Sequence, residues 1–261
     1  MVYGQSQSIF SIQLPAMREA SLGLDSVLVV IPVLNEAATI AGVVSGLQAL
    51  GLHHIRVVDN GSRDGTAEIA ARCGADVVYE PIAGYGQACW RGLQGLPAAT
   101  RWVLFCDGDG SDDLASLPEF LTHRPRCDLV LGNRTATAAG RAALTPAQHF
   151  GNRLATVLIW LGWGHRYRDL GPLRLLRRSA LERLAMQDRG FGWTVEMQVR
   201  AIEERLRIRE LPVAYHPRRG GKSKISGTLG GSVRAGTVIL STLGSLYLRR
   251  LAALGRWPAK G

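Results

Sequence analysis

The stretch SVLVVIPVLNEAATIAGVVSGLQAL (26–50) decides the fold. Its first part, 26–34, is short, apolar and rich in β-branched residues, which is typical of a buried parallel strand. Gly51 closes the second part, in which apolar residues recur at the spacing of one helix face: Ile40, Val43, Val44, Leu47 and Leu50. We therefore predict a strand followed by a helix.

The same unit recurs further along the chain. Strand-like runs occupy 54–59, 76–81, 101–106 and 128–134, and helical patterns occupy 64–74 and 84–96. Such regular alternation predicts an α/β fold with a mostly parallel sheet and helices on both of its faces. Ligands bind such sheets at the carboxyl ends of the strands. We therefore expect four segments to converge on one edge: 32–36, 59–62, 84–86 and 107–109.

The pattern changes after residue 135. We predict helices over 146–163 and 193–206, a late strand within 207–217, and a basic, glycine-rich loop from 218 to 231. We divide the chain into an N-terminal leader (1–26), a catalytic domain (27–215), and a basic loop with an amphipathic C-terminal helix (216–261). No composition shift is sharp enough to separate two independent domains.

Composition limits the partners and the compartment. The chain has 261 residues and a formal net charge of +10, which favours an anionic partner. Aromatic residues are only 7% and show no base-stacking pattern, so we expect no nucleic acid partner. The four cysteines form no CxxC pair, and residues 1–26 show no secretory signal. We expect reduced thiols in a cytoplasmic protein.

An uncharged stretch near the C-terminus, AGTVILSTLGSLYL (235–248), is bordered by Arg234, Arg249 and Arg250. It is shorter than the roughly 20 residues that span a bilayer. Its composition suits a helix lying on a membrane surface, peripheral to the inner face of the membrane. The alternative is a terminal helix packed on the core.

The acidic stretch FCDGDGSDD (105–113) follows a predicted buried strand. Asp107 and Asp109 are separated only by Gly108, and that spacing lets both carboxylates face one hard cation. The alternative is an acidic turn in solvent. We interpret Asp112 and Asp113 as N-terminal caps of the next helix.

Two further segments carry polar groups suited to a nucleotide. Asp59 ends the second predicted strand, and its carboxylate could accept hydrogen bonds from a base or a ribose, or simply belong to a turn. The loop with Arg218, Arg219, Lys222 and Lys224 could bind phosphate, or be a solvated basic turn. GYGQAC and HPRRGGKS depart from the dinucleotide and Walker A patterns, so we reject both motifs.

Five motifs in order, VVIPVLNEAATI, VVDNGSRDGT, AGYGQA, FCDGDGSDD and GNR, resemble the family 2 glycosyltransferases with the GT-A fold. The resemblance covers residues 27–226. The segments DLGPLRLLRRSAL (169–181), VEMQVRA (195–201) and RRGGKSK (218–224) are most similar to the dolichyl-phosphate and polyprenyl-phosphate mannosyl- and glucosyltransferases.

The resemblance implies roles for the donor site. Asp59 matches the carboxylate that reads the base of the nucleotide. Asp107 and Asp109 match the DxD pair that holds Mg²⁺ or Mn²⁺ on the sugar-nucleotide diphosphate. The remaining implied contacts to the nucleotide sugar, here a UDP- or GDP-hexose, are Pro32, Asn35, Glu36 and Gly86.

The resemblance also implies an acceptor side. Arg134 matches an arginine near the donor and acceptor phosphates. A mobile basic loop with Arg219, Ser223 and Lys224 would close over them. The acceptor implied by the subgroup is a polyprenyl phosphate.

Three departures from the family pattern stand out. Ser111 replaces a common Gln, Asn60 replaces a common Asp, and we find no C-terminal transmembrane helix. The first two also suit a sugar-nucleotide-binding protein that has lost turnover, and this remains an alternative function.

The acceptor determines which groups the reaction needs. A lipid phosphate is already an anionic nucleophile, whereas a hydroxyl acceptor would need a general base. Asp169 and Glu196 are the candidates for that base, and salt bridges to arginines are their alternative role. We predict metal-dependent hexose transfer to a polyprenyl phosphate, with inversion at the anomeric carbon. A soluble or hydroxyl acceptor is the alternative within the same donor chemistry.

Overall fold

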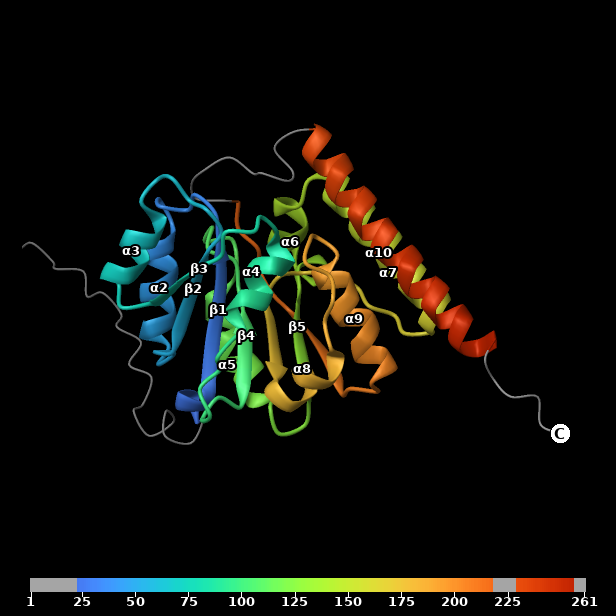
Figure 1. Ribbon diagram of the computed structural model, residues 1–261, viewed down its shortest axis with the longest axis horizontal. Helices are drawn as coiled ribbons and strands as arrows, with labels where there is room; N and C mark the ends of the chain where they lie inside the picture. Colours follow the sequence, from blue (N-terminus) through green and yellow to red (C-terminus); the bar gives the residue numbers. More distant parts are fainter. Residues whose placement is uncertain (1–22, 218–228, 256–261) are drawn as a thin grey trace, which may run out of the picture.

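The computed structural model describes residues 23–217 and 229–255. Its centre is a seven-stranded sheet with the order β3-β2-β1-β4-β6-β5-β7 (Figure 1). The strands are β1 Val27–Val33, β2 Ile55–Asp59, β3 Asp76–Tyr79, β4 Trp102–Phe105, β5 Leu129–Asn133, β6 Arg174–Arg177 and β7 Ile208–Pro212.

The sheet is mostly parallel, as predicted from the strand–helix alternation. β6 is antiparallel to both β4 and β5, with Arg174 in register with Phe105 on one side and Leu131 on the other. The other strand pairs are parallel. Consequently the carboxyl ends of six strands and the first residue of β6 lie along a single edge. The sequence pattern did not reveal β6.

Helices cover both faces of the sheet. One face carries α2 (Ile40–Ala49), α3 (Thr66–Arg72) and α5 (Leu117–Thr122), and the other carries α4 (Tyr85–Gly92), α8 (Arg178–Leu184) and α9 (Trp193–Glu203). A hydrophobic core lies on each face of the sheet, and alternate residues of β1 point into them. Val29 and Ile31 pack in one core, and Leu28 and Val30 pack in the other. The shorter elements are η2 Leu24–Ser26, η3 Leu114–Ser116, η4 Arg134–Ala136 and α6 Ala138–Ala143.

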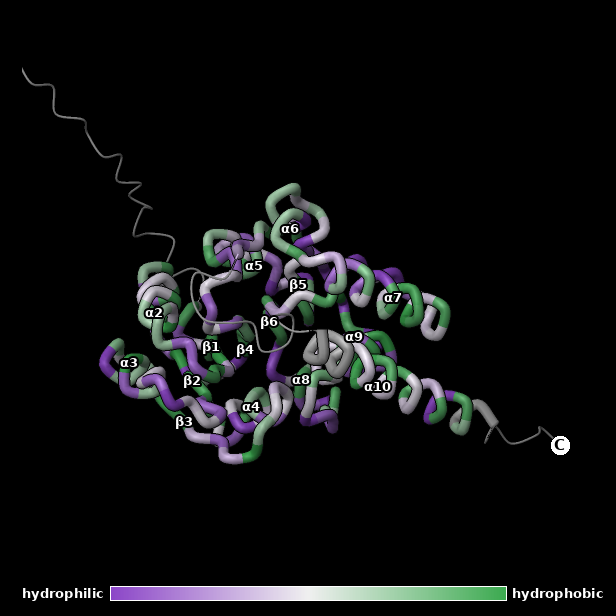
Figure 2. Tube along the Cα trace, turned by 90° about the horizontal axis from the view of Figure 1, so that it is seen from above, coloured by the Kyte–Doolittle hydropathy of each residue, from purple (hydrophilic) through white to green (hydrophobic). Residues whose placement is uncertain are grey.

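Two long helices, α7 (Pro146–Trp163) and α10 (Leu229–Gly255), lie side by side at one end of the molecule (Figures 1 and 2). The ring of Tyr247 packs on Trp163 with centroids 4.7 Å apart, and its hydroxyl donates to the Leu158 carbonyl. Leu243 and Leu246 are buried in the core of that face. Within the described residues, no helix has both the length and the apolar character needed to cross a membrane.

Candidate active site

The loops that follow β1 and β2 are joined by polar side chains. Asn35 has a left-handed backbone (φ 53°), and its side-chain oxygen accepts the Arg63 N–H at 2.7 Å. Its own N–H donates to the Ser62 hydroxyl at 2.9 Å, and the Glu36 N–H donates to the Thr66 hydroxyl at 2.8 Å. These bonds hold the two loops at the carboxyl edge of the sheet.

Pro32 and Asp59 lie on the neighbouring strands that lead into these loops. Pro32 is within β1, in register with Val58 of β2. Asp59 is the last residue of β2, is buried, and accepts the Ser62 N–H at 3.0 Å. Its position at the carboxyl end of a strand agrees with the one expected from the sequence.

Asn60 shapes the loop that follows β3. Its side-chain amide donates to the carbonyls of Glu80 (2.9 Å) and Ile82 (2.7 Å), while its oxygen accepts the Gly84 N–H (2.8 Å). A carboxylate has no N–H to donate, so an aspartate could not form the first two bonds. The departure from the common Asp therefore has a structural reason.

The loop that follows β4 is held close to the sheet. An added Cβ on Gly108 would lie 2.6 Å from Val33 Cγ1, so this position requires glycine. The Gly108 carbonyl accepts the Thr39 hydroxyl at 2.8 Å. The close approach fixes where the two carboxylates on either side of Gly108 leave the backbone.

Ser111 directs the carboxylate of Asp109. Both its N–H (3.0 Å) and its hydroxyl (2.5 Å) donate to Asp109 Oδ1, and both residues are buried. A hydroxyl is a neutral donor, so these bonds orient the carboxylate without cancelling its charge. Ser111, which replaces the common Gln, thus orients the Asp109 carboxylate.

The predicted caps Asp112 and Asp113 are wrong. Neither side chain caps η3; instead Asp112 Oδ2 accepts the Asp107 N–H at 2.8 Å, and Asp113 Oδ2 accepts the Ala214 N–H at 3.1 Å. For Asp113 the reason is tertiary, because the segment after β7 lies against this loop and offers the Ala214 N–H. Asp112 instead bonds to a backbone N–H of its own loop. Burial, followed by the charge of Asp107, raises the pKa of Asp112 well above its usual range.

Asp107 lines a cavity of about 370 Å³ together with Gly110, Asp112 and His216. Tyr85 reaches its Oδ1 with a 3.4 Å hydroxyl contact. Burial, then the charge of Asp107, raises the pKa of Tyr85 well above its usual range, so its phenol stays protonated and donates.

The donor set fits a divalent cation that is carried by its substrate. Asp107 and Asp109 offer carboxylate oxygens, the ligands preferred by Mg²⁺ and Mn²⁺. Across residues 23–217 and 229–255, no group of three or more His, Cys, Asp or Glu side chains could hold a metal by itself. Diphosphate oxygens and waters would therefore have to complete the coordination.

Arg134, directly after β5, forms a bidentate ion pair with Asp169. Its Nε donates to Asp169 Oδ2 and its Nη2 to Oδ1, both at 2.9 Å. The N–H groups of Arg134 and Leu170 also donate to this carboxylate, at 2.7 and 2.8 Å. Burial acts to lower the pKa of Arg134, and the bonds to Asp169 outweigh it and raise the pKa.

Glu196 is also engaged by neighbouring groups. Its Oε2 accepts the N–H groups of Gln187 (2.9 Å) and Asp188 (2.7 Å), and its Oε1 pairs with Arg200 Nε at 2.8 Å. The structure therefore places both proposed bases in arginine pairs, which is the alternative role stated for them above. Their carboxylates serve to hold loops.

Gly86 packs against the loop between α8 and α9. Its N–H donates to the Gly190 carbonyl at 3.0 Å, and an added Cβ would lie 2.8 Å from the backbone of Arg189 and Gly190. The close packing of α4 on this loop explains why residue 86 is a glycine.

Sequence reasoning missed Arg174, a buried arginine at the start of β6. Its guanidinium donates to the carbonyls of Gly171 (2.8 Å), Thr194 (2.8 Å) and Leu170 (3.3 Å). It thereby shapes the turn beside Asp169. The only signal was a charge following Pro172 and Leu173 in an otherwise apolar run.

The predicted loop residues Arg218, Arg219, Lys222, Ser223 and Lys224 lie outside the described residues. The segment leading to them is described: the Arg134 guanidinium stacks 4.9 Å from the centre of the Tyr215 ring, and the His216 N–H donates to the Ser111 carbonyl at 2.9 Å. The described segment with Tyr215 and His216 thus lies next to both Arg134 and the acidic loop.

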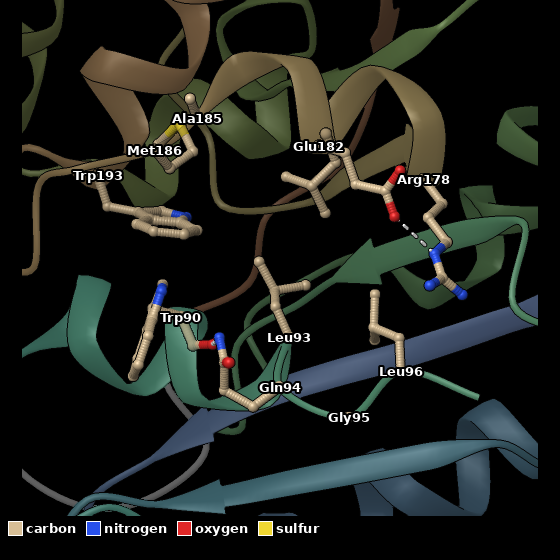
Figure 3. Close-up of a pocket in the computed structure, with 11 residues that line it drawn as sticks. Trp90, Leu93, Gln94, Gly95, Leu96, Arg178, Glu182, Ala185, Met186 and Trp193 are labelled. Carbon is tan, nitrogen blue, oxygen red and sulfur yellow. Dashed lines mark hydrogen bonds and ion pairs between the residues drawn. The ribbon is translucent and has the colours of Figure 1, made fainter. Parts of the chain in front are cut away.

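A larger cavity, of about 490 Å³, lies away from this edge, between α4 and α8 (Figure 3). Its walls include Trp90, Trp193 and Met186, and the Arg178–Glu182 pair borders one end. None of the predicted site residues lines it.

Comparisons with known proteins agree with the fold. Among solved structures, glucosyl-3-phosphoglycerate synthase from Mycobacterium tuberculosis with Mn²⁺, uridine diphosphate and glucosyl-3-phosphoglycerate superposes with a TM-score of 0.70 at 21% identity, covering 90% of this chain and 86% of that one. Mannosyl-3-phosphoglycerate synthase from Rubrobacter xylanophilus gives 0.64 at 20% identity, covering 94% and 80%. At such identities the likeness concerns the fold.

Sequence relatives are closer. An uncharacterised glycosyltransferase of Mycobacterium tuberculosis (H37Rv) is 41% identical over 222 residues, covering 81% of this chain and 94% of that protein. Glycosyltransferase AglJ of Haloferax volcanii is 32% identical over 199 residues, covering 76% and 65%. The model of glycosyl transferase family 2 matches residues 28–185. The chain therefore belongs to glycosyltransferase family 2.

Proposed function

We propose that this glycosyltransferase moves a hexose from a UDP- or GDP-hexose to a polyprenyl phosphate, with Mg²⁺ or Mn²⁺ held by Asp107 and Asp109. A phosphate oxygen of the acceptor attacks the anomeric carbon. The bond from that carbon to the nucleotide diphosphate breaks, and the diphosphate leaves with the electron pair. A single displacement of this kind inverts the anomeric centre.

The cation would supply the charge that stabilises the leaving diphosphate. The residues of this chain supply position: Ser111 orients the Asp109 carboxylate, and Gly108 brings the loop against β1. The metal-bound complexes of the glucosyl-3-phosphoglycerate synthase support the assignment by analogy of fold.

The donor nucleotide would extend along the ends of β1 and β2. Asp59 would accept a hydrogen bond from the base, with Asn35 and Glu36 shaping the floor beneath the nucleoside. Gly86, next to Tyr85, would border the diphosphate near Asp107.

The proposed acceptor class rests on two ion pairs, Asp169 with Arg134 and Glu196 with Arg200. A hydroxyl acceptor needs a base to remove its proton, and a carboxylate committed to arginine and backbone N–H groups is a poor one. A phosphate acceptor needs no base. It needs positive charge, which the basic residues Arg219 and Lys224 would supply, with Ser223 and the guanidinium of Arg134 as further hydrogen-bond donors.

A phosphorylated but water-soluble acceptor is the second candidate. The solved neighbours are named for phosphoglycerate products, and their fold matches along most of this chain. A polyprenyl acceptor would in addition require the enzyme to reach a membrane surface peripherally, consistent with a cytoplasmic protein of +10 net charge.

One assay separates these acceptors. The purified full chain is incubated with UDP- or GDP-hexoses and Mn²⁺, and either a short-chain polyprenyl phosphate or 3-phosphoglycerate, and the products are followed by mass spectrometry. The proposal predicts a glycosylated lipid phosphate, lost on chelation and in Asp109→Asn. Transfer only to phosphoglycerate would reassign the acceptor.

The non-catalytic alternative is tested on the same samples. Metal-dependent donor binding raises the melting temperature by mass action whether or not turnover occurs. A thermal shift with a nucleotide hexose but no product with either acceptor, and no donor hydrolysis, would favour a binding protein.

A further inference from the structure

α7 exposes an apolar stripe to solvent. Phe150, Val157, Trp160 and Leu161 recur at helical spacing on one side, with Phe150 71% and Leu161 67% exposed. The opposite side, which includes Ile159, is buried in the core. Large apolar groups left in water on one helix side are characteristic of a contact surface.

α10 exposes a second stripe beside it. Leu240, Leu248 and Leu251 are spaced by eight and three residues and therefore share one side of the helix. Leu248 is 69% and Leu251 61% exposed, while Leu243 and Leu246 turn toward the core. The two helices pack together, so the stripes belong to neighbouring parts of one end of the molecule (Figures 1 and 2).

All charged residues within the two helices are basic. Neither 146–163 nor 229–255 contains an Asp or Glu. Arg153, Arg249 and Arg250 are exposed on the pair, and the Arg166 guanidinium lies 4.2 Å from the centre of the Trp160 ring. Apolar side chains flanked by arginines, with Trp160 in contact with one of these arginines, match the composition of an interfacial helix.

We propose that the exposed faces of α7 and α10 form a surface that docks on an anionic phospholipid bilayer. The stripes of the two helices would enter the headgroup region, and the arginines would contact lipid phosphates. The proposal rests on the proposed function in one respect, since a lipid-linked acceptor requires access to a bilayer. It extends the membrane contact from the C-terminal helix to α7.

Charge favours the bilayer over a second copy of this chain. A two-fold symmetric dimer built through the pair would bring identical patches together. Because the pair holds arginines and no acids, such a contact would oppose like charges across the interface. An anionic surface instead complements them.

Docking would also set the orientation of the active edge. The Thr242 hydroxyl of α10 donates to Asp188 at 2.8 Å, in the loop between α8 and α9. Gly190 of the same loop accepts the N–H of Gly86, at the start of α4 beside Tyr85. A short series of contacts thus joins the proposed membrane surface to the acidic loop.

Vesicle flotation tests the surface on the full chain. Vesicles of phosphatidylcholine alone are compared with vesicles containing phosphatidylglycerol, at low and high salt. We expect binding to the anionic vesicles that weakens with salt, because screening removes the arginine contribution. No binding to anionic vesicles at low salt would overturn the proposal.

Variants locate the contact. Leu161→Glu with Leu248→Glu places one charge in each stripe and should weaken vesicle binding at least tenfold, because both side chains would lose their burial in lipid. Tyr79→Glu, at an exposed aromatic on β3, is the matched control and should bind normally. All are exposed positions, and circular dichroism checks that each variant is folded.

Quenching of tryptophan fluorescence reports which side chains enter the bilayer. Brominated lipids quench tryptophans that enter the bilayer, so Trp160→Phe should remove most of the quenching while Trp90→Phe, in the cavity between α4 and α8, should not. Equal loss of binding in the Tyr79 control, or quenching unchanged by Trp160→Phe, would contradict the assignment. A dimer in solution that the two Glu substitutions dissociate, with no vesicle binding, would assign the surface to a second copy instead.

The two proposals fail separately. Transfer to a short, soluble polyprenyl phosphate without vesicles should be unaffected by the Leu161 and Leu248 substitutions, because neither lies at the active edge. Vesicle binding without lipid glycosylation would retain the surface and reject the acceptor. Glycosylation of the soluble lipid without vesicle binding would retain the acceptor and reject the membrane surface.

Discussion

The loop that follows β4 and the loop that precedes β6 both carry buried carboxylates but hold them differently. In the loop before β6, the Asp169 carboxylate accepts hydrogen bonds from the Arg134 guanidinium and from two backbone N–H groups. In the loop after β4, the N–H and the hydroxyl of Ser111 orient the Asp109 carboxylate. An ion pair cancels a charge inside the chain, whereas neutral donors only direct it. The first arrangement holds two loops together, and the second fixes the direction of the Asp109 carboxylate.

The strongest test of this contrast is Asp109→Asn. The neutral amide keeps the shape of the side chain but loses the charge, so we expect transfer to fall about 10⁴-fold through weaker stabilisation of the leaving diphosphate. Initial rates with Mn²⁺ measure it. Asp113→Asn is the control, because its oxygen can still accept the Ala214 N–H. Less than a tenfold loss in Asp109→Asn would rule out a role in metal binding.

Breaking the ion pair should affect stability instead. Arg134→Met leaves the buried Asp169 charge unpaired, so we expect unfolding free energy to fall by about 3–5 kcal/mol in denaturant titrations. Adding Asp169→Asn removes that charge and should recover most of the loss, while activity stays low because Arg134 is absent. A double variant as unstable as the single one would show that the guanidinium acts through packing.

Ser111→Ala sharpens the contrast within the acidic loop. Both carboxylates remain, but Asp109 loses its hydroxyl donor, so the Mn²⁺ concentration for half-maximal activity should rise about tenfold. Ser116→Ala is a matched control, since its hydroxyl bonds only the Asp113 carbonyl. An unchanged Mn²⁺ requirement would mean that the backbone N–H of Ser111 suffices.

The smallest effect concerns Asp128, which pairs with Arg207 and Arg177 at the start of β5. Hydrogen bonds from Arg207 hold the pKa of Asp128 well below its usual range. A depressed folded-state pKa stabilises the protein above the unfolded value of about 4 and loses that effect as pH falls through the folded-state value. Asp128→Asn should lower the melting temperature by a few degrees at pH 7.

The difference between Asp128→Asn and the unsubstituted chain should narrow below about pH 4. Asp76→Asn is the comparison, because its pair with Arg56 is more exposed (58% for the Asp76 side chain) and should matter less. If the difference in melting temperature between Asp128→Asn and the unsubstituted chain stayed constant across pH, the loss would come from changed hydrogen bonds and not from the charge of Asp128.

Local patterns were sufficient for much of this molecule. The strands that begin at Val27, Ile55 and Trp102, and the helices that begin at Ile40 and Trp193, follow apolar periodicity that neighbouring residues set. By contrast β6 pairs with β4 and β5 from distant positions in the chain, and its short apolar run did not distinguish strand from helix.

The functional residues divide in the same way. The position of Asp107 and Asp109 at the carboxyl edge follows from the strand directly before them, so the sequence determined it. The partners of Asp113 and Asp169 come from other elements, up to 101 residues away along the chain. Glu196 instead pairs with Arg200 of the same helix and accepts N–H groups from the preceding loop. Whether a carboxylate caps, pairs or remains charged depends on which donors surround it in space. Only the tertiary structure brings those donors together, because hydrogen bonds and ion pairs form over a few ångströms regardless of distance along the sequence.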